Sequence, residues 1–125
     1  MSFITMEQVN LVRNIAAILT TANETLSVAE SSAGGLISAC LLSIPGASSF
    51  FVGSSVLYSY QIRKEIVGMG KEEHRIYGGS TPELILEIAL RFREKTGTDW
   101  VIARVPVSMT ETDSPPPFAT KRLVP

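Results

Sequence analysis

The chain has 125 residues, of which 45% are hydrophobic and 18% are charged, and its formal net charge is −1. This length fits one domain with a core of ordinary size. The near-neutral charge gives no electrostatic reason to expect a nucleic acid or a membrane surface as a partner. The single cysteine, Cys40, rules out an intramolecular disulfide, which agrees with a reducing compartment. Because the first residues lack the apolar run of a signal peptide and no stretch has transmembrane length, we expect a cytoplasmic protein.

The first third of the chain predicts a helix, a strand and a second helix. Thr5 and Gln8 form a capping-box pattern, and apolar residues then recur at helical spacing over about residues 6–22. Alternating apolar residues predict a short strand over residues 26–30. The run GLISACLLSI predicts a mostly buried helix over residues 35–44, which ends at the Pro-Gly pair that follows.

The middle of the chain predicts a buried strand, a short helix and a charged loop. SSFFVGSSVLYSY contains a predicted strand over residues 50–58, whose two faces are both apolar or small, as expected of a strand covered on both sides. A short helix follows over about residues 60–67 and is closed by Gly68. GKEEHRIYGG is loop-like and holds the only histidine, His74, which we expect to be exposed and solvated.

A further helix and strand complete the predicted pattern. Thr81 caps the helix, Pro82 takes its first position, and DWVIA opens the strand. Strands that alternate with helices predict an α/β layered sheet over residues 1–109. The proline-rich residues 110–125 predict a disordered tail. The predicted core residues are Leu26, Val28, Val52, Val56, Val101 and Ile102 in the sheet, and Ile15, Leu19, Leu41, Ile85 and Ile88 in the helices. Ala89 and Phe92 share the inner face of the last helix with Ile85 and Ile88.

The segment VAESSAGGL, residues 28–36, places two hydroxyls and two glycines where a predicted strand meets a helix. A helix start leaves backbone N–H groups unpaired and carries a partial positive charge, and glycines there let a ligand approach the backbone. Ser31 could therefore bind a phosphate, or attack a carbonyl while the N–H groups hold the oxyanion. Ser31 or Ser32 could equally form a compact helix cap, and the spacing alone leaves these alternatives open.

A nucleophilic serine needs a group that accepts its proton. Nothing in the sequence ties His74 to Ser31, so a Ser-His-Asp triad is not expected. Strand ends in such sheets meet at one edge, so Tyr58, with Arg63 and Lys64 just beyond it, could face the serine. An edge tyrosine with solvated cations on a helix would give the same pattern.

Several spaced motifs resemble those of the CinA C-terminal domain family. That family has the pattern A-E-S-[CS]-T-G-G, then P-G-S-S, then Y-S-N-x-x-K, then leucine or isoleucine before glycine. The likeness covers roughly residues 7–103, and several motifs in register make it specific. The matching segments here are AESSAGG at 29–35, PGAS at 45–48, YSY at 58–60 with Arg63, VG at 67–68, and YGGSTPE, which looks like the family's G-A-V-S-E.

The resemblance implies a three-layer α/β/α fold and hydrolysis of the carboxamide of nicotinamide mononucleotide to the acid and ammonia. By this likeness the chain is an amidase of pyridine nucleotide metabolism, with Ser31 as nucleophile, Tyr58 as a hydrogen-bonding partner and Arg63 at the position of the family's lysine. The resemblance implies a small nucleotide as the molecule that the chain binds. We expect no cofactor, metal, nucleic acid or membrane. A homo-oligomer remains an open alternative. The implied pocket residues are Glu30, Ser32, Gly34, Gly35 and Ser48.

Two departures from the family pattern bear on activity. Arg63 replaces the lysine, and arginine is a poor general base because it keeps its proton well above physiological pH. Lys64 lies about 100° further round the helix and would have to turn inward to substitute. After DWVIA the family's T-G-I-A-G-P loop and later strands give way to RVPVSMTETDSPPP, so we expect a domain truncated after about residue 103.

Three functions remain open at this point. The first is an amidase with Ser31 as nucleophile. The second is a catalytically silent relative that binds a nucleotide or phosphate at the helix start over residues 31–35. The third is an interaction module that presents SPPPF, residues 114–118, as a polyproline ligand.

Overall fold

The described residues form helices on both faces of a four-stranded sheet with the order β2-β1-β3-β4. The structure is a computed structural model and describes residues 4–79 and 81–104, together with the backbone of 119–122. Strand β1 is parallel to both β2 and β3, and β4 is antiparallel to β3. The elements in chain order are α1 (Met6–Ala22), β1 (Leu26–Glu30), α2 (Leu36–Leu41), a 3-10 turn (Ala47–Ser49), β2 (Phe51–Val56), α3 (Tyr60–Val67), α4 (Lys71–Ile76), α5 (Pro82–Thr96), β3 (Trp100–Ala103) and β4 (Ala119–Arg122).

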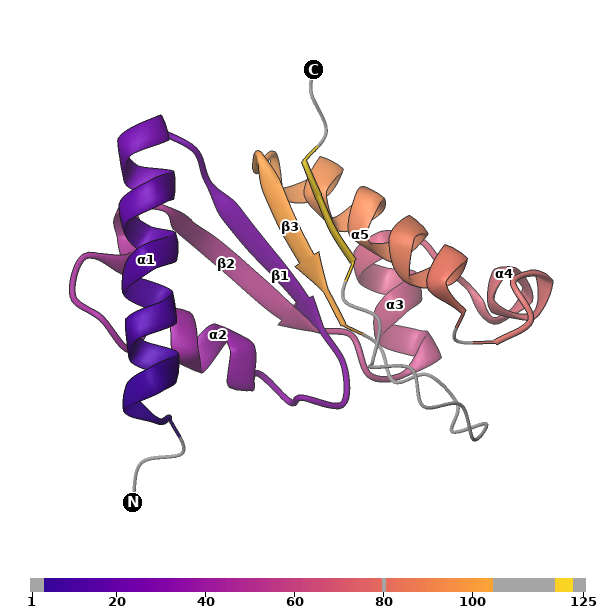
Figure 1. The fold of residues 1–125 in the computed structure, drawn as a ribbon. Coiled ribbons are helices and arrows are strands. Elements are labelled where there is room, and N and C mark those ends of the chain that lie inside the picture. Colours follow the sequence, from indigo (N-terminus) through magenta and orange to yellow (C-terminus); the bar gives the residue numbers. More distant parts are fainter. Residues whose placement is uncertain (1–3, 80, 105–118, 123–125) are drawn as a thin grey trace.

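The three layers predicted from the sequence are confirmed. Helices α1 and α2 cover one face of the sheet, and α3 and α5 lie on the other (Figure 1). The central strand β1 is buried along its whole length because it has a neighbour on each side and a helical layer over each face. Its successive side chains enter opposite cores: Val28 packs with α1 and α2, whereas Ala29 packs with α5.

The predicted helix starts are confirmed in detail. At the start of α1 the Gln8 N–H donates to Thr5 Oγ1 at 3.1 Å, and the Thr5 N–H donates to Gln8 Oε1 at 2.8 Å. Both partners of the capping box are therefore formed. At the start of α5 the Leu84 N–H donates to Thr81 Oγ1 at 3.3 Å, and Pro82 occupies the first turn. These caps depend on local sequence alone, which is why the pattern identifies them.

Two predictions about the middle of the chain are wrong. β2 is an edge strand, covered on only one face; Val52 is 57% exposed and Val56 43%, although both were predicted to lie in the core. Helix α5 contacts β1, β3 and β4, so it does not reach over β2. The charged stretch around His74 is a helix, α4, and not a loop. None of its residues is buried, and its charged sequence KEEHRI lacks the apolar period that would have predicted a helix.

Differences also occur at α2 and near the carboxyl end. Helix α2 ends at Leu41, earlier than predicted, and turns fill the residues up to the Pro-Gly pair. Residues 119–122, within the predicted tail, form β4 and pair with β3 from Trp100 to Ala103. An edge of β3 offers unpaired N–H and C=O groups, which a following segment can satisfy without any strong pattern of its own. The rest of the predicted tail, including the SPPPF motif, lies outside the described residues.

Candidate functional site

The carboxyl ends of β1 and β2 lie side by side and carry the candidate residues. Glu30 pairs with Val56 in the register of the two parallel strands, and the Leu57 N–H donates to the Glu30 carbonyl at 2.6 Å. Ser31 follows Glu30, so it emerges from the sheet next to Leu57. In Figure 1 both arrowheads point to this lower edge of the molecule. Ligands of open α/β sheets bind beyond the carboxyl ends of the strands, so this edge is where a site is expected.

The turn after β1 is built around two glycines with left-handed backbones. Gly34 has φ 63° and Gly35 has φ 96°, a region that side chains with a Cβ rarely adopt. The Gly34 N–H donates to the Ser31 carbonyl at 3.0 Å. A Cβ added at Gly34 would meet nothing within 4 Å. The backbone conformation therefore explains the glycines, and close packing against another group does not.

The start of α2 is capped by the Glu30 carboxylate. Oε1 accepts the Ile37 N–H at 2.9 Å, and Oε2 accepts the Ser38 N–H at 3.1 Å. The Ser38 hydroxyl also donates to Oε2, at 2.5 Å. The N-cap position itself is a glycine with no side-chain acceptor, which leaves room for a carboxylate from outside the helix. The expectation of free N–H groups at this helix start is wrong, since a buried anion already occupies two of them.

Ser31 is the polar group that this turn leaves without a partner. It is 2% exposed, and its Oγ accepts and donates no hydrogen bond within the part of the chain that the structure describes. The backbone N–H groups of Ser32, Ala33 and Gly35 likewise have no acceptor among the described residues. A buried hydroxyl is normally hydrogen-bonded. Ser31 therefore combines an unused nucleophilic atom with nearby unused backbone donors.

Arg63 projects from α3 toward the same edge. It is buried, and its Nε donates to the Leu57 carbonyl at 2.9 Å. Burial lowers the pKa of the Arg63 guanidinium from its ordinary value, and Tyr60 offsets part of this effect. Lys64, the alternative base, is exposed and lines a hollow on the α5 side of α3 with Arg91, so it does not turn inward.

Two predicted site residues form no hydrogen bond with Ser31 in the described part of the chain. Tyr58 follows β2 at the same edge but is 71% exposed, and no hydrogen bond joins it to another described residue. Ser48 is exposed in the turn before β2, beside the amino ends of the strands. The Leu26 N–H donates to the Phe50 carbonyl at 2.8 Å, which places this turn at the start of β1. Ser48 and Ser31 therefore lie at opposite ends of β1, and the structure does not bring them together.

His74 belongs to a small cluster on α3 and α4. Its ring meets the Tyr60 ring edge-on, with centroids 4.9 Å apart, and Lys71 Nζ lies 6.0 Å from the Tyr60 centroid. Burial lowers the pKa of His74, and the nearby Arg63 charge lowers it further. The expectation of a fully solvated histidine is wrong. Sequence reasoning missed this cluster because no periodic pattern links Tyr60 to His74 across the bend between the two helices.

The lowered pKa of His74 predicts a measurable titration. We expect its ring protons to titrate by NMR below the ordinary histidine value of about 6.5. The folded state then favours the neutral form of His74. The resulting contribution to the free energy of unfolding is complete above about pH 6.5, and it is lost as the pH falls through the lowered pKa of His74. Arg63→Gln should raise the midpoint in part, whereas Arg75→Gln, at an exposed position beside it, should not. A midpoint at or above the ordinary value would contradict the structure.

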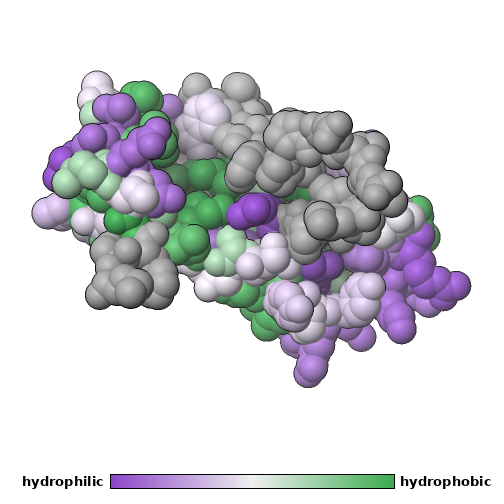
Figure 2. Space-filling model, turned by 60° about the horizontal axis from the view of Figure 1, so that its bottom comes forward, coloured by the Kyte–Doolittle hydropathy of each residue, from purple (hydrophilic) through white to green (hydrophobic). Residues whose placement is uncertain are grey.

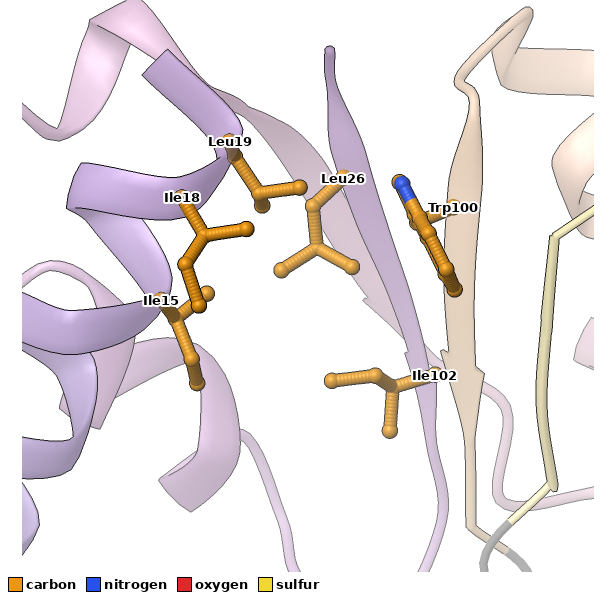
Figure 3. A pocket seen from close by; sticks show the side chains of 6 residues that line it. All are labelled: Ile15, Ile18, Leu19, Leu26, Trp100 and Ile102. Carbon is orange, nitrogen blue, oxygen red and sulfur yellow. The ribbon is translucent and has the colours of Figure 1, made fainter. Parts of the chain in front are cut away.

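The apolar hollow of the structure is separate from this edge. It measures about 320 Å³ and lies between α1 and the first half of β1 and β3 (Figure 3). All six labelled side chains point into it, and they are Ile15, Ile18, Leu19, Leu26, Trp100 and Ile102. Figure 2 brings the lower edge of Figure 1 forward, and on this face hydrophilic side chains lie at both the left and the right end, with hydrophobic surface between them. Leu26 and Trp100 each begin a strand, so the hollow is at the opposite end of β1 from Ser31.

Among the described residues no group of three or more His, Cys, Asp or Glu side chains is placed to hold a metal ion. No helix in the described part of the chain combines the length and apolar character needed to cross a membrane.

Helices on both faces of a mostly parallel sheet place the chain in the class of three-layer α/β/α domains. Comparison with known families makes the assignment specific: the model of the CinA C-terminal domain matches residues 8–108. The chain belongs to this family.

Curated relatives agree with this assignment. A CinA-like protein of Prochlorococcus marinus strain AS9601 is 40% identical over 85 residues, which is 68% of this chain and 20% of that protein. A CinA-like protein of Fervidobacterium nodosum is 46% identical over 67 residues, or 54% of this chain and 16% of that protein. The chain thus spans about a fifth of the length of the curated relatives that it matches.

Solved structures show the same fold. A competence/damage inducible protein from Agrobacterium tumefaciens superposes with a TM-score of 0.82 at 24% identity, covering 98% of this chain and 78% of the other. A competence-damaged protein (CinA) superfamily member from Escherichia coli has a TM-score of 0.75 at 17% identity, with 98% and 82% covered. At these identities the likeness establishes the fold alone.

Proposed function

We propose that this CinA-like domain is a weak serine amidase that hydrolyses the carboxamide of nicotinamide mononucleotide to the acid and ammonia. The observation that supports the proposal is the Ser31 hydroxyl, which is buried and has no hydrogen-bond partner among the described residues. An unsatisfied buried polar group costs free energy, so its retention at a ligand-binding edge favours a chemical role.

In the proposed reaction Ser31 Oγ forms a bond to the carboxamide carbon, and the carbonyl π electrons move onto oxygen. The unused N–H groups of Ser32 and Ala33 are available to donate to that oxyanion. The Ser31 proton passes to water. Collapse of the intermediate then breaks the C–N bond, and the leaving nitrogen takes a proton from water and departs as ammonia. A second water hydrolyses the acyl-serine to the acid and restores the serine hydroxyl. Because Ser31 is only 2% exposed, the groups that cover it must move aside before a substrate can reach Oγ.

The proton of Ser31 limits the rate of this reaction. Arg63 keeps its proton near neutral pH even though burial lowers its pKa. Its guanidinium can stabilise a developing anion but cannot accept the serine proton. General-base assistance is worth about 10²- to 10⁴-fold in rate, so we expect turnover slower by that margin than with a lysine base.

The alternative of a phosphate held at the start of α2 loses support. The Glu30 carboxylate occupies the Ile37 and Ser38 N–H groups and would repel an anion at that position. The interaction alternative depends on SPPPF, which lies outside the described residues. The amidase proposal therefore rests on more described contacts than either alternative.

An amidase assay on the purified chain tests the proposal. We expect slow release of ammonia from nicotinamide mononucleotide, abolished by Ser31→Ala with nucleotide binding largely retained. Ser32→Ala is the matched control, because Ser32 is exposed and contributes its backbone N–H rather than its hydroxyl. Turnover that survives Ser31→Ala would show that another group is the nucleophile, and absence of any turnover would refute the amidase function.

A further inference from the structure

We propose that Glu30 is a positioning residue for Ser31. Its carboxylate accepts the N–H groups at the start of α2, so the serine hydroxyl is not used to cap that helix. The inference rests on the proposed role of Ser31. It differs from the pocket role that the family resemblance implies for Glu30, because the carboxylate is turned to the interior and is 1% exposed. No substrate is needed to explain where its oxygens lie.

Glu30 is fixed from two sides. Its side chain accepts three hydrogen bonds from the first turn of α2, two from the Ile37 and Ser38 N–H groups and one from the Ser38 hydroxyl. Its backbone carbonyl accepts the Leu57 N–H at the end of β2. One residue therefore joins the end of β1 to both β2 and α2. Residues 31–35 form the loop that these contacts close.

The closed loop constrains Ser31 although its side chain forms no bond. Ser31 follows Glu30 directly, and its carbonyl accepts the Gly34 N–H at 3.0 Å inside the same loop. Its backbone is thus fixed on both sides of its Cα. The position of Oγ is then set by backbone contacts rather than by a partner of its own, which leaves the hydroxyl available for reaction.

The capping chemistry explains why a carboxylate is needed here. Serine is among the preferred residues for capping a helix start, because its hydroxyl accepts the N–H groups of the first turn. In this chain Glu30 already accepts the N–H groups at the second and third positions of α2. Ser31 and Ser32 directly precede the same helix start, so their hydroxyls are the alternative caps that the sequence offers. Glu30 therefore prevents the nucleophile from being used as a cap.

Amide hydrogen exchange on the full chain tests whether Glu30 holds the turn. Glu30→Gln keeps the shape but replaces one acceptor oxygen by a donor, so we expect the amides of Ile37 and Ser38 to exchange at least about tenfold faster. Glu65→Gln is the matched control, since Glu65 is exposed on α3, and should leave both rates unchanged. Unchanged exchange in a folded Glu30→Gln chain would overturn the proposal.

Ser38→Ala provides a second test if Glu30→Gln does not fold. It removes the hydroxyl donor and retains both backbone donors, so a smaller acceleration, about threefold, is expected at Ile37 and at the amide of position 38. No acceleration in this variant would also overturn the proposal.

The reactivity of Ser31 separates a positioning role from a purely structural one. We expect phenylmethanesulfonyl fluoride to sulfonylate Ser31 Oγ, with loss of fluoride and of the serine proton. Mass spectrometry measures the rate of this labelling. The rate should fall at least about tenfold in Glu30→Gln and stay unchanged in Glu65→Gln. Equal labelling rates in the two folded variants would overturn the positioning role. If the unaltered chain is not labelled, the proposed role of Ser31 as a nucleophile is overturned, and the positioning role of Glu30 is overturned with it. The hydrogen-exchange experiment would still decide whether Glu30 holds the turn.

Discussion

Arg63→Lys is expected to raise the rate of amide hydrolysis by about 10²- to 10⁴-fold, the usual gain from general-base assistance. The reason is the environment of position 63. Burial lowers the pKa of the arginine there without making it a base. The same burial would lower the pKa of a lysine from an ordinary value of about 10.4 toward neutrality, where its neutral form can accept the Ser31 proton.

Controls at Lys64 and Ser31 decide how the gain arises. Lys64→Arg makes the reverse exchange at an exposed neighbouring position and should leave the rate unchanged. The Arg63→Lys/Ser31→Ala double variant should lose the gain entirely, because the lysine acts on the serine proton. The rate of Arg63→Lys should also rise with pH through the lowered lysine pKa. A gain that persists in the double variant would exclude Ser31 as the nucleophile.

Ile85→Ala is expected to lower the free energy of unfolding by about 2–5 kcal/mol. Ile85 lies on the inner face of α5 and is 0% exposed, in contact with the core that includes Val101 and Ala29. The substitution removes apolar contacts and leaves a cavity that the packed layers can only partly fill. Small domains are stable by only about 5–15 kcal/mol in total, so a large share of the stability is lost.

Leu86→Ala is the matched control for this experiment. Leu86 is the next residue of the same helix but is 37% exposed, so the same kind of truncation should cost less than about 1 kcal/mol. Urea unfolding of both variants measures the difference. Equal losses at the two positions would show that α5 does not pack with the face that the structure assigns to the core.

The sequence by itself determined the features that depend on neighbours along the chain. The Thr5–Gln8 capping box, the Thr81 cap with Pro82 after it, and the inner face of α5 are all set within a few residues. Hydrogen bonds between a cap and its first turn, and the 3.6-residue period of a buried face, are local and leave a local signature. Strands that alternate with helices likewise predicted the layered α/β class.

Tertiary structure decided how completely each strand is covered. The residues of β2 are apolar or small on both faces, yet it is an edge strand because α5 lies over β1, β3 and β4 instead. Nothing within residues 51–56 encodes the position of a helix that starts at Pro82. β4 is a similar case, since its pairing with β3 depends on an available strand edge and not on a pattern of its own.

The candidate site divides in the same way. Ser31, Gly34 and Gly35 could be selected from the sequence, because a strand-to-helix turn with left-handed glycines has a short-range signature. The sequence could not show that Glu30 points into α2 and leaves the Ser31 hydroxyl without a partner. Burial and hydrogen-bond partners depend on what packs around a side chain. Only the assembled layers therefore decided that Glu30 caps α2 and that the adjacent Ser31 hydroxyl remains unpaired among the described residues.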